Sequence, residues 1–281
     1  MGCLNDEGKF SHWFGNIHLS GPCNRSCYFC IGQHMMALDP FNNLNKIPDN
    51  LDAFLQECGR RRVAEVCLTG TNTDPLLYKH HLELLLKIRE AMGAEVLPHG
   101  PVALRTNGVS YSEEIFGLYD KASISICSFD KTINNQIMGG DPPNLERILA
   151  NHPTMDIKIN VILCPENIKR DIWHTLDMCA YHGIRRVNLR EPYGQPHVGD
   201  PLSRVNALKI KETFGMPTYN WGFTEVTYWD VHYVEVESVN LYASGRISVT
   251  YPITKGHVDG GVALPQYMFP GGRVHEQWLN Y

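Results

Sequence analysis

The chain has 281 residues, of which 43% are hydrophobic, and its 25 basic and 30 acidic side chains give a formal net charge of −5. A chain of this size can form one large domain, and it lacks the basic excess that is typical of proteins that bind a phosphate backbone. Nucleic acid is therefore not expected as its partner. The sequence contains neither an apolar signal segment nor a run long enough to span a bilayer, so we expect a cytoplasmic protein without a membrane contact.

Short β-rich segments alternate with longer helical ones over the first 200 residues. The candidate strands cover residues 16–20, 64–69, 102–106, 122–128, 156–163 and 185–190. The candidate helices cover residues 48–62, 78–93, 112–119, 144–150 and 168–183. Because strand and helix alternate, we expect an α/β fold with a parallel sheet and right-handed crossovers, either open or curled into a barrel.

Polar and apolar residues alternate along these strands. In the segment 156–163, for example, Ile157, Ile159 and Val161 alternate with Lys158 and Asn160. A parallel sheet covered on both faces usually has continuously hydrophobic strands, so a polar second face indicates a wet, ligand-holding interior. A sheet with one solvent-exposed face is the alternative. An inward-pointing Lys158 would require a carboxylate partner or an anionic substrate, unless it lies at the exposed end of its strand.

The pattern changes after Pro201. Residues 209–215 are compatible with a last helix, and residues 223–252 are compatible with two or three strands that turn at 243–245. The Gly- and Pro-rich end after residue 256 is expected to be an irregular tail. We therefore predict a core over residues 1–200 and a β-rich, antiparallel annex with its tail over residues 201–281, packed on that core.

Three of the nine cysteines lie within eight residues, in the segment "GPCNRSCYFC". An odd number of cysteines without an export signal argues against a disulfide framework. Cys23, Cys27 and Cys30 can hold three irons of a cubic four-iron cluster and leave the fourth iron open for a reactant. A structural zinc site that adds His34 as fourth ligand is the competing interpretation.

The spacing Cys23-x-x-x-Cys27-x-x-Cys30, with Phe29 before the last cysteine, resembles the cluster motif of the radical S-adenosylmethionine (radical SAM) superfamily. Further segments resemble that family in the same order, and they are "LTGTNTDPLLY", "LRTNG", "SISICSFD" and "KINVIL". The resemblance covers residues 14–195 and implies a partial (β/α)6 barrel whose cluster loop follows the first strand. Gly70, Thr71 and the Asn72–Asp74 run stand where the family often has two glycines and a glutamate.

The resemblance implies a [4Fe-4S] cluster on the three cysteines and S-adenosylmethionine beside it. It assigns S-adenosylmethionine contacts to one aromatic pair, three residues after the second strand and five further polar residues: Tyr28, Phe29, Gly70, Thr71, Asp74, Thr106, Asn107, Ser125, Asn160 and Arg190. Glu191 and Tyr193 are candidates on the substrate side. Cys127 is a candidate hydrogen-atom donor, with a packing role as its alternative.

The function implied is reductive cleavage of S-adenosylmethionine to a 5′-deoxyadenosyl radical that acts on a small biosynthetic molecule such as a nucleotide or sugar. An external electron donor of the flavodoxin or ferredoxin type would be required. The chain has no cysteine after Cys179, which argues against auxiliary clusters in the annex. Two alternatives stay open: modification of a peptide or tRNA, and a non-catalytic, zinc-stapled α/β binding protein.

Overall fold

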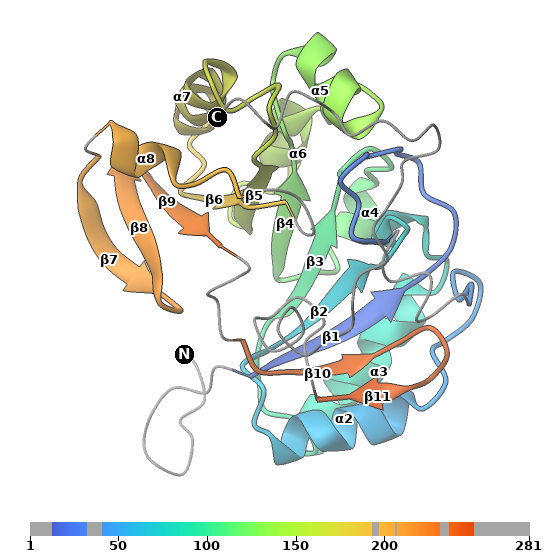
Figure 1. The fold of residues 1–281 in the computed structure, drawn as a ribbon. Helices are drawn as coiled ribbons and strands as arrows, with labels where there is room; N and C mark the ends of the chain where they lie inside the picture. Colours follow the sequence, from blue (N-terminus) through green and yellow to red (C-terminus); the bar gives the residue numbers. More distant parts are fainter. Residues whose placement is uncertain (1–12, 33–40, 193–196, 206, 231–235, 250–281) are drawn as a thin grey trace.

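The computed structural model describes residues 13–32, 41–192, 197–205, 207–230 and 236–249. Its centre is a curved sheet with the strand order β11-β10-β1-β2-β3-β4-β5-β6-β9-β8-β7. The first six strands run parallel and match the six predicted from the sequence; they are β1 (Phe14–Leu19), β2 (Glu65–Gly70), β3 (Val102–Thr106), β4 (Lys121–Ser125), β5 (Asp156–Ile162) and β6 (Arg186–Arg190). The sheet curls without closing (Figure 1).

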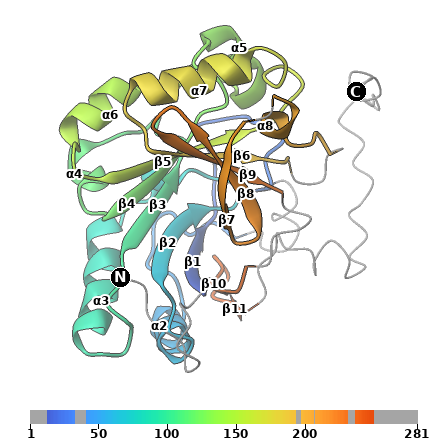
Figure 2. The ribbon, with the colours of Figure 1, turned by 90° about the vertical axis from the view of Figure 1, so that its left-hand side faces the viewer.

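Helices cover the outer face of this sheet (Figure 2). They are α2 (Leu51–Arg60), α3 (His81–Gly93), α4 (Glu113–Phe116), α5 (Lys131–Met138), α6 (Leu145–Asn151) and α7 (Asp171–Tyr181), with a short 3-10 turn, η1 (Pro75–Leu77), after β2. The apolar side chains of the strands, including Ile17, Ile124, Ile159 and Leu189, are fully buried against these helices. The polar side chains between them consequently point to the inside of the curve.

Helix α5 was absent from the sequence prediction. It begins at Asp130, whose carboxylate accepts hydrogen bonds from the backbone N–H groups of Thr132 and Ile133. It ends at Gly139, whose φ of 73° is a left-handed conformation that glycine adopts at low cost. The interior of α5 contains the weak helix formers Asn134 and Asn135, and these obscured its signal.

The chain after Pro201 adds strands to both edges of the sheet. After the short helix α8 (Pro201–Arg204), the strands are β7 (Lys209–Thr213), β8 (Met216–Trp221), β9 (Thr224–Trp229), β10 (Ser238–Leu241) and β11 (Ile247–Ser248). The antiparallel β7-β8-β9 unit continues the sheet because β9 pairs in parallel with β6. β10 pairs in parallel with β1 at the other edge. The division into a core and an annex at residue 200 stays a prediction.

The helix predicted over residues 209–215 is wrong, because Lys209–Thr213 forms strand β7. Phe214 and Gly215 adopt positive φ angles of 54° and 76°, which make a tight turn into β8. A row of threonine hydroxyls then links the three strands, with Oγ1–Oγ1 distances of 2.9 Å from Thr213 to Thr218 and 3.0 Å from Thr218 to Thr227. The turn and this row favour a hairpin over a helix.

Candidate active site at the carboxyl ends of the strands

The three clustered cysteines line a cavity of about 230 Å³ at the carboxyl ends of β1 to β6. Cys23 is exposed, and Cys27 and Cys30 are half-buried. The backbone turns tightly between the last two, since the N–H of Cys30 donates to the carbonyl of Cys27 over 3.2 Å. The Sγ of Cys27 lies 3.7 Å from the carbonyl oxygen of Met138 at the end of α5. The loop that follows β1 therefore presents three thiols to one cavity.

These thiols influence one another electrostatically. Burial, followed by the nearby Cys30 and Cys23, raises the pKa of the Cys27 thiol to about 12. Burial also raises the pKa of Cys23. Thiols of this kind ionise only when a metal binds them, and thiolate is the usual ligand of iron–sulfur clusters. The donor set thus fits a cluster held at three irons.

The described residues contain no group of three His, Cys, Asp or Glu side chains gathered around a single metal ion. A cubane cluster, in contrast, takes each cysteine on a different iron, so its ligands stand farther apart than those of one ion. His34, the fourth ligand in the zinc interpretation, lies outside the described residues.

The segment after β2 holds the cysteine loop in place. Asn72 Oδ1 accepts hydrogen bonds from the Ser20 hydroxyl over 2.8 Å and from the Gly21 backbone N–H over 3.2 Å. The Thr73 hydroxyl donates to the Pro22 carbonyl over 2.6 Å. A Cβ on Gly32 would lie 2.3 Å from the Thr71 carbonyl oxygen, so the two segments touch backbone to backbone. The Gly70–Asp74 segment therefore fixes the position of the cysteine loop.

Asp74, predicted to bind S-adenosylmethionine, ties β2 to β3 instead of presenting a free carboxylate. It is buried, and its Oδ2 accepts from the Asn107 backbone N–H over 2.6 Å. The Thr106 hydroxyl donates to both carboxylate oxygens, over 2.7 Å and 2.9 Å, and the Leu76 N–H donates to Oδ1 over 2.9 Å. Burial raises the pKa of this carboxyl despite these bonds. Little acceptor capacity is left for an ammonium group.

Thr106 and Asn107 are also engaged within the protein. The Asn107 amide donates to Asn24 Oδ1 over 2.7 Å, and its Oδ1 accepts from the Val109 N–H over 3.0 Å. Both residues line the cavity, as predicted, but they do so as parts of the scaffold between β3 and the cysteine loop.

Three other predicted residues face the cavity with groups suited to a ligand. They are Ser125 on β4, Asn160 on β5 and Arg190 on β6. Neither the Ser125 hydroxyl nor the Asn160 side-chain amide hydrogen bonds to another described residue. Arg190 brings a guanidinium, which binds carboxylates bidentately. The structure thus gathers Ser125, Asn160 and Arg190 around one space.

The aromatic pair of the motif divides between two environments. Phe29 lines the cavity, and Tyr28 turns its hydroxyl to Glu166 Oε2 over 2.7 Å. Their rings meet edge to face with centroids 5.9 Å apart. Phe29 is accordingly placed for a flat ligand, and Tyr28 anchors the loop to the segment after β5.

The three candidates on the substrate side have different positions. Cys127 is fully buried behind the cysteine loop with Ile137, Met138 and Cys164, and it does not line the cavity. Glu191 lines the cavity but is buried. Tyr193 lies outside the described residues.

The Glu191 carboxylate holds the segment after β6. It accepts from the Tyr228 hydroxyl over 2.5 Å and from the backbone N–H groups of Val198 and Gly199 over 2.9 Å and 2.7 Å. Three donors of this kind fix the carboxylate against β9 and make Glu191 a positioning residue for this segment.

The sequence prediction missed further cavity residues, among them His18, Arg25 and Arg105. His18 and Arg105 stand on the polar sides of β1 and β3, so strand alternation could have identified them. Arg25 lies inside the cysteine motif, where spacing alone gives no signal.

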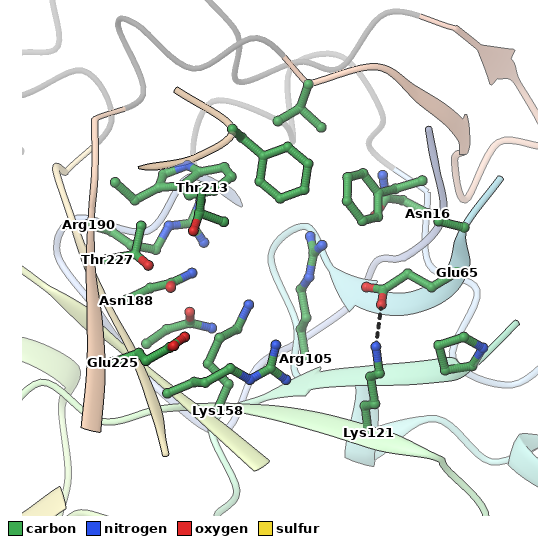
Figure 3. A pocket seen from close by; sticks show the side chains of 18 of the residues that line it. Asn16, Glu65, Arg105, Lys121, Lys158, Asn188, Arg190, Thr213, Glu225 and Thr227 are labelled. Atoms are coloured by element: carbon green, nitrogen blue, oxygen red, sulfur yellow. Dashed lines mark hydrogen bonds and ion pairs between the residues drawn. The ribbon is translucent and has the colours of Figure 1, made fainter. Parts of the chain in front are cut away.

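A second, larger cavity of about 790 Å³ lies along the inner face of the sheet toward the amino ends of the strands (Figure 3). The two cavities share Arg105, Asn160 and Arg190 in their linings, so they adjoin. The polar, ligand-sized interior predicted from the strand pattern is thereby confirmed.

No protein-family model and no curated protein matches the chain. Among solved structures, Streptococcus suis SuiB bound to S-adenosylmethionine superposes with a TM-score of 0.55 and 13% identity, covering 86% of this chain. The same protein bound to its precursor peptide SuiA gives 0.50 and 17%, over 70% of this chain and 45% of that one. anSMEcpe with bound AdoMet and the Cp18Cys peptide gives 0.50 and 13%, over 66% and 54%.

The chain has the radical SAM fold. This confirms the partial barrel expected from the cysteine motif, with a sheet that stays open. The chain spans 61% of the length of the SuiB chain that it matches. No helix in the described part of the chain is long and apolar enough to cross a membrane.

Proposed function

We propose that the protein is a radical SAM enzyme. The observation that carries this proposal is the set of three thiols at the carboxyl ends of the parallel strands, facing a cavity in a fold that superposes on proteins with bound S-adenosylmethionine. Ligands of parallel βα folds bind at this end of the strands.

In this proposal Cys23, Cys27 and Cys30 hold a [4Fe-4S] cluster. When bound, the cluster and S-adenosylmethionine supply a 5′-deoxyadenosyl radical that abstracts a hydrogen atom from the substrate. Phe29, Ser125, Asn160 and Arg190 bind and orient S-adenosylmethionine, with Arg190 on its carboxylate.

A second set of residues positions this site. Asp74 and Thr106 join β2 to β3, and Asn107 joins β3 to the cysteine loop at Asn24. Gly70 and Thr71 hold the amino group of S-adenosylmethionine. Tyr28 anchors the loop at Glu166. Glu191 fixes the Val198–Gly199 backbone beside β9, and Tyr193 stays a candidate on the substrate side. Cys127 receives no catalytic step, because it is buried behind the loop.

The proposed substrate is a small biosynthetic molecule, since the second cavity has the volume of a small-molecule site. The reaction requires an external one-electron donor of the flavodoxin or ferredoxin type. We place the enzyme in the cytoplasm, where thiols stay reduced. Modification of a peptide is the second candidate, favoured by the peptides bound to SuiB and anSMEcpe.

The test is the iron, sulfide and zinc content of protein purified without oxygen, followed by an assay for 5′-deoxyadenosine with S-adenosylmethionine and a reductant. We expect about four irons per chain, loss of iron and of product in Cys27→Ala, and retention of both in Cys179→Ala, a buried cysteine of helix α7. Colourless protein with one zinc per chain would overturn the proposal in favour of the zinc-stapled binding protein.

A further inference from the structure

The larger cavity is strongly basic. Its lining contains six cationic side chains, Arg105, Lys121, Lys158, Arg186, Arg190 and Lys211, against two carboxylates, Glu65 and Glu225. Figure 3 shows most of these side chains around the open space. An excess of positive charge inside a curved sheet focuses the electrostatic field on whatever enters.

Part of this charge is compensated within the protein. Lys121 Nζ lies 3.4 Å from Glu65 Oε2, and Lys211 Nζ lies 2.6 Å from Glu225 Oε2. Arg186 forms an ion pair with Asp156 at the rim.

Lys158 is not part of these ion pairs, and the negative charge of Glu65 affects it less than the positive charges of Arg105 and Arg186. Its ammonium forms no hydrogen bond or ion pair with any described residue. Burial, followed by the positive charges of Arg105 and Arg186, lowers its pKa to about 8. A cation without a partner in such surroundings destabilises the protein, and an anionic ligand would remove that cost.

The register of the sheet arranges the lining in rows. Arg105, Ser123, Lys158, Arg186 and Glu225 are successive neighbours across β3, β4, β5, β6 and β9, so three cations stand at one level.

The next inward-facing row toward the carboxyl ends is polar and uncharged. It contains Ser125, Asn160, Asn188 and Thr227. Above it, Arg190 stands beside Trp229, and this level adjoins the cysteine cavity. A ligand therefore meets cations at one end and amides and hydroxyls toward the cysteines.

S-adenosylmethionine does not account for this charge pattern. Its sulfonium and ammonium outweigh its carboxylate, so the molecule is a net cation near neutral pH. A row of three cations disfavours such a ligand. The occupant of the larger cavity must instead carry negative charge.

We propose that the larger cavity binds a phosphorylated, hydroxyl-bearing small molecule, with its phosphate at the row of Arg105, Lys158 and Arg186 and its hydroxylated part at Asn188. Lysine and arginine are the usual phosphate binders, and amides suit hydroxyl groups. The phosphate then lies away from the cysteines, and the organic part points to them. The claim that this ligand is the substrate rests on the proposed function, whereas the claim that it binds does not.

The test is calorimetric titration of the full-length protein, purified without oxygen, with ribose 5-phosphate, AMP, inorganic phosphate and ribose. We expect the phosphorylated compounds to bind and ribose not to bind. Lys158→Met should lower the affinity for ribose 5-phosphate at least tenfold, because it removes the central cation. The matched control, Lys87→Met, alters an exposed lysine of helix α3 and should leave the affinity unchanged.

Two further readouts separate binding from a structural role. Without ligand, Lys158→Met should have the same or a higher melting temperature than the natural chain, since it removes a half-buried charge that forms no ion pair with a described residue. Asn188→Ala should weaken ribose 5-phosphate binding several-fold and leave inorganic phosphate binding unchanged. Tighter binding of AMP than of ribose 5-phosphate would identify a nucleotide, and the reverse order a sugar phosphate; both orders support the proposal.

Unchanged phosphate affinity in Lys158→Met, or ribose binding as tight as that of its phosphate, would overturn the inference. The two proposals fail separately. Phosphate binding that depends on Lys158, without any 5′-deoxyadenosine formation, would overturn the enzyme and keep the site. Formation of 5′-deoxyadenosine without such binding would keep the enzyme and overturn the phosphate site.

Discussion

Buried polar residues at the strand ends have two roles that the sequence does not distinguish. Asp74, Thr106 and Asn107 were predicted to contact a ligand, and all three line the cavity. Their hydrogen bonds, however, join β2, β3 and the cysteine loop to one another. Ser125 and Asn160 have the same kind of polar side chain and keep it open to the cavity. Only the neighbours brought by the fold decide between scaffold and ligand contact.

His18 is a buried, neutral histidine whose effect on stability can be measured. Its Nε2 lies 3.1 Å from Asn240 Oδ1, and its ring stacks on Tyr242 with centroids 4.9 Å apart. Burial, with a smaller contribution from Arg105, lowers its pKa to about 4. The unfolded chain, with a pKa near 6.5, takes up the proton first as the pH falls. Stability is therefore full above pH 6.5 and decreases from there to pH 4.

We expect this group to remove about 1.4 kcal/mol of the free energy of unfolding between pH 7.5 and 5.5. Urea unfolding at the two pH values measures the loss, which should be smaller by that amount in His18→Gln. His99→Gln, which changes an exposed histidine, should behave as the natural chain. Equal losses in all three proteins would contradict the pKa assignment.

Among the secondary-structure elements, the sequence predicted the parallel strands best. All six were identified because β-branched residues alternate with polar ones between recognisable helices. The errors occurred at α5, where two asparagines weaken the helical pattern, at β7, whose exposed "KIKET" suits either structure, and at β8, which was not predicted. For β7 the decision comes from its pairing with β8, an interaction between elements that local propensity does not contain.

The close backbone contact between the cysteine loop and the segment after β2 predicts that Gly32 does not tolerate a larger side chain. In Gly32→Ala the added Cβ would lie 2.3 Å from the Thr71 carbonyl oxygen and 2.4 Å from the Asn72 Cα, so the backbone must shift. We expect a several-fold loss of iron per chain after anaerobic purification, with the melting temperature little changed, because the displaced loop misplaces its thiols.

The matched control is Gly93→Ala at the end of helix α3. Nothing lies within 4 Å of the added Cβ there, and alanine suits a helix. This variant should retain its iron. Full iron content in Gly32→Ala would show that the loop does not need this close backbone contact.

At the scale of the whole molecule, the annex forms one continuous sheet with the barrel strands. The sequence predicted strands over residues 223–252 with a turn at 243–245, but it missed the hairpins that β8 forms with β7 and β9. It also could not place β9 beside β6 or β10 beside β1, since these pairings join distant segments. Contacts outside the sheet strengthen the connection. Trp221 of β8 stacks on Trp173 of α7 with centroids 5.5 Å apart and donates to Asp177 over 2.9 Å.

This continuity predicts a single cooperative unfolding transition for the two parts of the chain. Stacked tryptophans give an exciton band in circular dichroism, so the Trp173–Trp221 pair reports on the junction, whereas the 222 nm signal reports on the helices. We expect both signals to change at the same urea concentration. Trp173→Phe should remove the exciton band, which would show that the band arises from the Trp173–Trp221 pair. Two separate transitions would instead support a boundary at residue 200.

Among the paired strands of the described sheet, β1 and β10 lie farthest apart in the chain. Asn16 Nδ2 donates to Asn240 Oδ1 across 224 positions of the chain. At a synthesis rate of roughly 5–20 residues per second, the outer edge of β1 waits on the order of tens of seconds on the ribosome for its partner. An unpaired strand edge can pair with other chains during that time. Co-translational protection of residues 14–19 should therefore govern how much of this protein reaches its native state in the cell.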